Sequence, residues 1–151
     1  MCPIMVREDE IVQEVVIMAS AERIFRALTR PEELLQWWEV EGEFQLLEAE
    51  CDLQPGGKWR MRVAGRCAAE APISTVYGEY REVDPPRLLT YTWIREQENW
   101  PETLVRWNLK QEDGYTTVRV THSGLINEAL RERNSGWSLV VTLLANYVDR
   151  R

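Results

Sequence analysis

The sequence predicts an α+β domain in which a curved antiparallel sheet wraps around a long C-terminal helix. Residues 137–148 carry an apolar stripe with helical spacing. Between residues 44 and 123, short segments rich in β-branched and aromatic side chains follow one another with turn signals between them. Two short amphipathic segments precede them. The predicted order is therefore one strand, two short helices, six strands and one long helix.

The first elements are predicted from composition and capping. Residues 1–10 are expected to form an N-terminal tail, and 11–151 a single domain. Residues 11–18, rich in Val and Ile, predict a strand. Ser20 is the expected N-cap of the first helix, and Pro31 opens the second. The apolar sides of these helices are Ala21, Ile24, Phe25 and Leu28, and then Leu34, Trp37 and Trp38.

The six following strands are predicted from alternation. The clearest is 58–63, where Trp59, Met61 and Val63 alternate with basic residues. Residues 95–102 are polar and predict a loop that contains Trp100. The other strands are predicted over 44–52 and 73–83, around Leu89, Tyr91 and Trp93, around Val105, Trp107 and Leu109, and around Val118, Val120 and His122.

The last helix is predicted to be the cover of the sheet. Asn127 is a plausible cap for a short segment at 128–133, and Gly136 interrupts or kinks the chain after it. Leu139 and Leu143 widen the apolar stripe of the long helix, so that helix is expected to be largely buried. The stripe itself consists of Trp137, Val140, Val141, Leu144, Tyr147 and Val148.

Composition excludes several classes of function. The formal charge of −7 and the lack of a basic stripe disfavour nucleic-acid binding. No apolar stretch is long enough to cross a membrane, and no signal peptide is evident. Three scattered cysteines and one histidine do not match a metal site, and no cofactor motif is present. A cytoplasmic protein without a cofactor is expected.

The tryptophans carry the main functional hypothesis. The chain has seven of them, and an indole is bulky and carries one N–H that needs a partner. Trp59, Trp93 and Trp107 are assigned to the concave face of the sheet, and Trp137 to the helix that covers it. Rings this large either fill a core or line a hollow. Because a curved sheet cannot touch the helix everywhere, the rings are predicted to surround a gap of roughly a few hundred Å³.

A set of short motifs, found in a fixed order, resembles a known superfamily. The sequence is similar to the START-like helix-grip (SRPBCC) proteins, and within them to homologues of the heat-shock-protein-90 ATPase activator C-terminal domain. The resemblance covers about residues 11–148. The matching stretches are 21–28 followed by Pro31 and Trp37-Trp38, then 53–59, 78–86, 88–93, 121–124, and Gly136-Trp137.

The resemblance implies a helix-grip fold with a hydrophobic cavity between the sheet and the long helix. Relatives bind lipids, polyketides or other apolar molecules, some act as aromatases or cyclases, and one branch stimulates a chaperone ATPase. One fold hosts many functions, so the motifs predict the fold more specifically than the activity.

The candidate site is a set of ligand-binding residues with no catalytic member. His122 is the only histidine; it is interpreted as structural or ligand-orienting, because no GxSxG or similar nucleophile motif accompanies it. Tyr80 is included although the facing of its strand is open. The candidates are Trp37, Trp38, Trp59, Met61, Tyr80, Tyr91, Trp93, Val105, Trp107, His122, Trp137, Val141 and Leu144, and each has ordinary core packing as its alternative reading.

Three functions are compared. Binding of a small hydrophobic molecule comes first and predicts a closed apolar cavity. A chaperone-associated interaction protein predicts a filled interior and an exposed patch. A cyclase or hydrolase predicts buried polar groups, including His122, converging in the cavity. Exposed sheet edges leave monomer and homodimer open.

Overall fold

A computed structural model describes residues 10–40, 44–65, 73–96, 101–126, 128, 131 and 136–150. Residues 1–9 of the predicted tail, Trp100, the predicted cap Asn127 and most of the predicted segment at 128–133 lie outside these residues. Glu10, the last residue of the predicted tail, instead begins the first strand, because its backbone pairs with Ser123. The elements are β1 (Glu10–Ile17), α1 (Ala21–Thr29), α2 (Pro31–Trp37), β2 (Glu39–Val40), β3 (Phe44–Cys51), β4 (Lys58–Gly65), β5 (Ile73–Asp84), β6 (Leu88–Arg95), β7 (Thr103–Glu112), β8 (Tyr115–Ser123) and α4 (Trp137–Arg150).

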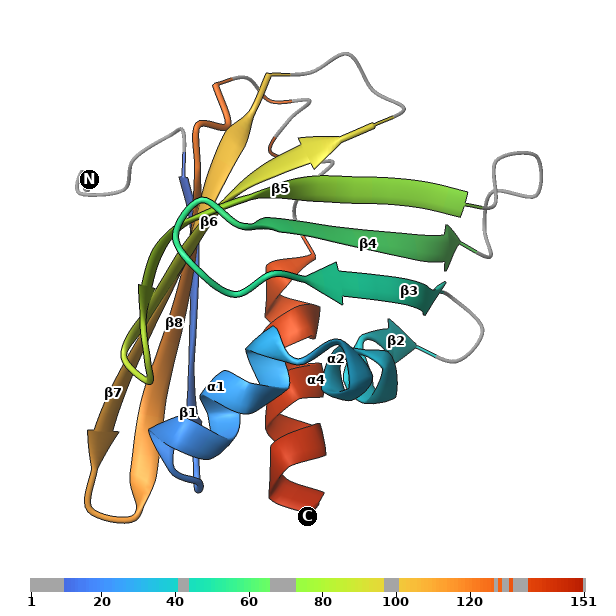
Figure 1. Cartoon of the computed structure of the whole chain (residues 1–151). Helices are drawn as coiled ribbons and strands as arrows, with labels where there is room; N and C mark the ends of the chain where they lie inside the picture. The colour runs from blue at the N-terminus through green and yellow to red at the C-terminus, as the bar shows by residue number, and fades with distance from the viewer. Residues whose placement is uncertain are drawn as a thin grey trace.

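The predicted α+β helix-grip architecture is confirmed. The strands form one antiparallel sheet in the order β1-β8-β7-β6-β5-β4-β3-β2 (Figure 1). The sequence analysis missed β2, because two residues are too few to show a period. β1 is the exception to pairing between chain neighbours, since it pairs with β8 from Glu10↔Ser123 to Ile17↔Thr116.

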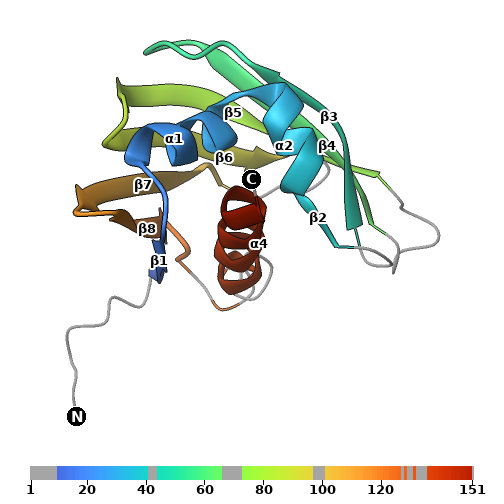
Figure 2. The same cartoon turned by 90° about the horizontal axis from the view of Figure 1, so that it is seen from below.

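The sheet curls around α4, with α1 and α2 on the same concave side (Figure 2). α1 and α2 connect β1 to β2, the two edge strands, so they bridge the open side of the curled sheet. Register shifts at Leu46/Glu48 and at Tyr80/Glu82 mark irregularities that strengthen local bending. The sheet thereby encloses an interior together with α1, α2 and α4.

The two short helices begin where their capping residues predict. The Ser20 side chain accepts a hydrogen bond from the Arg23 backbone N–H at 3.1 Å, and Pro31 occupies the first turn of α2. α1 buries Ile24, Phe25 and Leu28 against the interior.

The buried face of α4 is narrower than predicted. Val141 and Leu144 are buried, as expected for the side that faces the sheet. Leu139, which was expected to widen the buried stripe, is instead 38% exposed, because it lies on the side of α4 turned away from the sheet. In the part of the chain that the structure describes, no helix has the length and apolar character needed to cross a membrane.

Gly78 allows the close approach of three strands. It is buried in β5, as is Tyr80, which settles the facing of this strand with Tyr80 toward the interior. The Trp59 indole N–H passes over this position and donates to the Thr92 carbonyl oxygen at 3.1 Å. A Cβ at Gly78 would collide with that carbonyl oxygen and lie 2.7 Å from Trp59 Nε1. The missing side chain is therefore a packing requirement.

Gly78→Ala should lower the free energy of unfolding by about 1–3 kcal/mol, the usual cost of overpacking a core. Urea denaturation followed by tryptophan fluorescence would measure it. Gly136→Ala is the matched control, because a Cβ there meets nothing within 4 Å. Equal effects of the two substitutions would contradict the packing argument.

Candidate functional site

The interior is filled by an interlocking set of aromatic rings. Trp137 of α4 lies at its centre, with ring centroids 5.5 Å from Trp93 and 5.9 Å from Trp107. It also meets Trp38 edge-on at 6.3 Å. On the sheet, Trp93 contacts Trp59 at 5.4 Å. These tilted and edge-on geometries are favourable for aromatic pairs, so the rings pack against one another.

The cavity that the structure describes among these rings is smaller than the expected few hundred Å³. The cavity found among the rings has a volume of about 20 Å³. That is room for about one water molecule. Where Trp137 meets Trp93 and Trp107, indoles from α4 and from the sheet contact one another and leave no wide gap between them.

The small cavity lies beneath α1 and α2 rather than beneath α4. Five predicted site residues line it: Trp38, Trp59, Met61, Tyr80 and Tyr91. The other eight do not. Seven of these eight are packed in the interior: Trp93, Val105, Trp107, His122, Trp137, Val141 and Leu144. The eighth, Trp37, lines a surface groove instead.

Three lining residues were missed. They are Leu28 of α1, Leu34 of α2 and Cys51 of β3. Leu28 and Leu34 had been placed on the apolar sides of their helices, but periodicity does not say that these helices close the cavity. Cys51 lies one residue before the end of the predicted strand 44–52 and carries no signal of its own.

The polar atoms at the cavity are neutral hydroxyl and thiol groups. Tyr80 hydrogen-bonds Cys51, and the Tyr91 hydroxyl accepts a hydrogen bond from Trp107 Nε1 at 3.0 Å. Burial raises the pKa of Tyr80, of Tyr91 and of the Cys51 thiol. No charged side chain lines this cavity. The arrangement suits an uncharged ligand or a water molecule.

His122 belongs to a buried chain of hydrogen bonds. Trp137 Nε1 donates to His122 Nδ1 at 2.9 Å, and His122 Nε2 lies 2.7 Å from Thr103 Oγ1. Because the Thr103 hydroxyl donates its proton to the Trp93 carbonyl oxygen, His122 Nε2 is the donor to Thr103. The ring is thereby fixed as the neutral tautomer protonated at Nε2.

This environment does not favour acid–base catalysis by His122. Burial, and secondarily the positive charge of Arg95, lower the pKa of His122 from 6.5 to about 3. Both ring nitrogens are occupied, and His122 is fully buried outside the cavity lining. It therefore joins α4 to β7 and β8 as a structural residue.

A polar cluster joins α1, α2 and α4 at the rim of the interior. Glu33 of α2 accepts hydrogen bonds from Arg23 Nη1 of α1 at 2.7 Å and from the Tyr147 hydroxyl of α4 at 3.0 Å. The Arg23 guanidinium also lies 5.3 Å from the Tyr147 ring centroid. Because Leu34 follows Glu33 directly, this cluster helps to fix the helical wall of the cavity.

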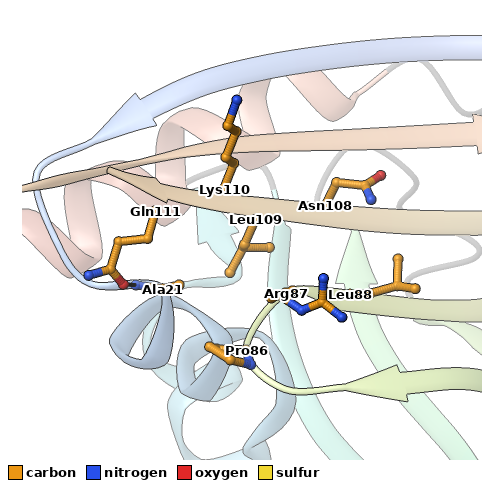
Figure 3. Close-up of a pocket in the computed structure, with 8 residues that line it drawn as sticks. All are labelled: Ala21, Pro86, Arg87, Leu88, Asn108, Leu109, Lys110 and Gln111. Carbon is orange, nitrogen blue, oxygen red and sulfur yellow. Dashed lines mark hydrogen bonds between the residues drawn. The ribbon is translucent and has the colours of Figure 1, made fainter. Parts of the chain in front are cut away.

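Larger hollows also lie on the described part of the surface. One, of about 530 Å³, lies where α1 begins, beside β7 and the turn from β5 to β6 (Figure 3). Its cations have partners, since Arg87 pairs with Asp84 and Lys110 lies 3.6 Å from Glu112. Another, of about 580 Å³, lies between α2 and α4. In the described ranges, no three His, Cys, Asp or Glu side chains are arranged to hold a metal ion.

Comparison with known proteins identifies relatives of the whole domain. Residues 18–149 match the family described as Activator of Hsp90 ATPase homolog 1-like protein. Protein CV1439 from Chromobacterium violaceum has a similar structure, with a TM-score of 0.80, 24% identity, and coverage of 93% of this chain and 98% of that one. The AHSA1-like protein from Aeromonas hydrophila gives 0.75 and 18%, with coverage of 93% and 92%.

A third similar structure is CalU16 from Micromonospora echinospora, with a TM-score of 0.69, 22% identity, and coverage of 92% of this chain and 75% of that one. At these identities the structural likeness shows the fold alone. No curated protein matches the chain significantly.

Proposed function

The chain belongs to the Activator of Hsp90 ATPase homolog 1-like family, and from this premise we propose that it binds a small, uncharged, apolar molecule in the cavity beneath α1 and α2. One observation carries the proposal: aromatic walls and neutral hydroxyls meet at a cavity that no charged side chain lines. Ligand sites are typically apolar with a few placed polar groups.

Binding at this site requires a wall to move, because about 20 Å³ holds no more than one small group. Trp38 is the wall best placed to do so. It follows the last residue of the seven-residue helix α2 and is 9% exposed, so its indole separates the cavity from the surface. A ligand that took the place of this indole would keep the aromatic contacts of Trp59 and Tyr91.

The direct test is native mass spectrometry of the protein purified from its own source, followed by a screen of apolar compounds read by tryptophan fluorescence. A co-purified molecule, or a saturable change in emission, is expected. If neither is observed, ligand binding at this site is contradicted.

Trp38→Ala should open the cavity and create a binding site for indole. The variant should lose about 3 kcal/mol of stability, the lower end for removing a buried tryptophan. Indole at a concentration 100 times its dissociation constant should restore about 2.7 kcal/mol of the free energy of unfolding. Thermal denaturation with and without indole measures both effects. Leu139→Ala, at a position 38% exposed, is the control and should show no indole effect.

Protein binding is a second candidate, favoured by the filled interior and by the groove between α2 and α4. Leu143 and Trp37 form its apolar floor, and Glu39 and Asp149 line it with carboxylates. This charge favours a basic amphipathic segment of a partner, and the family description suggests a chaperone. Stimulation of a chaperone ATPase by the protein, abolished in Leu143→Glu, would support it; no stimulation would argue against it.

A cyclase or hydrolase activity finds no support in the geometry, since His122 does not line the cavity. A cytoplasmic location and the choice between monomer and homodimer stay predictions from the sequence.

A further inference from the structure

At the cavity, the Tyr91 hydroxyl has a donor as its partner but no described acceptor for its own proton. The Tyr91 hydroxyl oxygen accepts from Trp107 Nε1 at 3.0 Å. Within the described residues, no acceptor is found for the hydroxyl's own proton, although a phenol can donate as well as accept. Tyr91 lines the cavity. Its O–H is therefore a donor available to a group inside that cavity.

A second donor without a partner lies on the same strand. Trp93 is 7% exposed, and its Nε1 has no hydrogen-bond partner in the described structure. Trp93 follows Tyr91 by two residues on β6, so both side chains project from the same face. Leaving a buried donor unpaired costs free energy, and such a group needs explanation.

The described interior does not offer free acceptors for these two donors. No buried side-chain oxygen of the described residues lacks a hydrogen-bond partner. No carboxylate, ammonium or guanidinium group lines the cavity. An ammonium group would bring further donors to a cavity where the Tyr91 hydroxyl already offers one, and an anion would be buried without a counter-charge. An oxygen that only accepts is the group that fits.

We propose that the ligand carries a carbonyl oxygen, which occupies the cavity and accepts a hydrogen bond from the Tyr91 hydroxyl. This inference rests on the proposed function. The volume of about 20 Å³ accommodates one oxygen-sized group, while the apolar body of the ligand takes the place of the Trp38 indole. The ligand class is an uncharged, apolar ketone, ester or quinone.

A matched probe series tests the choice of head group. Indane, 1-indanone, 1-aminoindane and indane-1-carboxylate share one ring system and differ in that group. Isothermal titration of the wild-type protein should give 1-indanone a roughly tenfold higher affinity than indane, the effect of one hydrogen bond. The amine and the carboxylate should bind more weakly than indane. Equal affinities for indane and 1-indanone would overturn the inference.

A pair of variants assigns the donor. In Tyr91→Phe the ratio of the 1-indanone affinity to the indane affinity should fall to about one. Tyr77→Phe makes the same chemical change at a tyrosine that is 38% exposed, and should keep the wild-type ratio. If the ratio survives in Tyr91→Phe, this hydroxyl is not the donor.

An infrared measurement avoids dependence on the variants' stability. The carbonyl stretching band of bound 1-indanone should lie at lower wavenumber than in an apolar solvent, since hydrogen bonding weakens the C=O bond. An unshifted band on the wild-type protein contradicts the inference. Failure of the proposed function and failure of the carbonyl assignment give different results. If neither indane nor 1-indanone binds, the proposed function fails. If both bind equally well, only the carbonyl assignment fails.

Discussion

Trp107→Ala should be among the most destabilising single substitutions in this protein, lowering the free energy of unfolding by about 5 kcal/mol, the upper end for loss of a buried tryptophan. Trp107 is fully buried at the centre of β7, and its ring contacts Trp137 at 5.9 Å. The substitution leaves a cavity and also removes the donor to Tyr91. The bulky Trp137 ring beside it limits the collapse that would reduce the cost.

The measurement is the urea midpoint with an unchanged m-value. Trp107→Phe is the matched control; it keeps most of the packing, loses the N–H donor to Tyr91, and should cost clearly less than alanine. Because Trp107 does not line the cavity, its alanine variant should lose stability without a selective loss of ligand affinity. A loss of less than about 1 kcal/mol would show that the interior is not packed as described.

Acid should destabilise the protein through the buried imidazole of His122. The folded-state pKa is lowered from 6.5 to about 3 by burial. Between these values the unfolded chain binds one more proton than the folded one, so stability falls as the pH falls below 6.5. The slope is about 1.4 kcal/mol per pH unit. Between pH 6.5 and 4.5 the expected loss is about 2 kcal/mol, because the full slope is reached only below pH 6.5.

Because the chain has a single histidine, no other imidazole titrates in the same pH interval. Urea denaturation at half-unit steps from pH 7.5 to 4.5 measures the slope. In His122→Phe the slope over this interval should nearly vanish, whatever the stability of the variant at pH 7. A pH-independent wild type would mean that the Trp137–His122–Thr103 chain is not formed.

The sequence predicted the elements well because their periods are local. The alternation at Trp59, Met61 and Val63 and the helical spacing from Trp137 to Val148 each lie within one element, and β4 and α4 follow. Burial of Trp93, Trp107 and Trp137 follows from the same patterns.

The size and position of the cavity could not be predicted from the sequence, because they depend on distances between elements. Facing indoles leave a hollow or meet according to the curvature of the sheet and the rotamer of each ring. Trp137 meets Trp93 at 5.5 Å, so these two rings leave no hollow between them. The remaining cavity depends on where Leu28 and Leu34 are carried by α1 and α2, and no periodicity specifies that position.

The pairing of β1 with β8 has a consequence for how the chain folds. Glu14 and Arg119, which pair across these strands, are 105 positions apart. Strand β1 is therefore synthesised well before β8, the strand it pairs with in this sheet. Such distant contacts are costly in chain entropy and slow folding. Until β8 is made, the Val- and Ile-rich β1 segment lacks that partner, and an unpaired strand is the kind of segment that promotes aggregation in nascent chains.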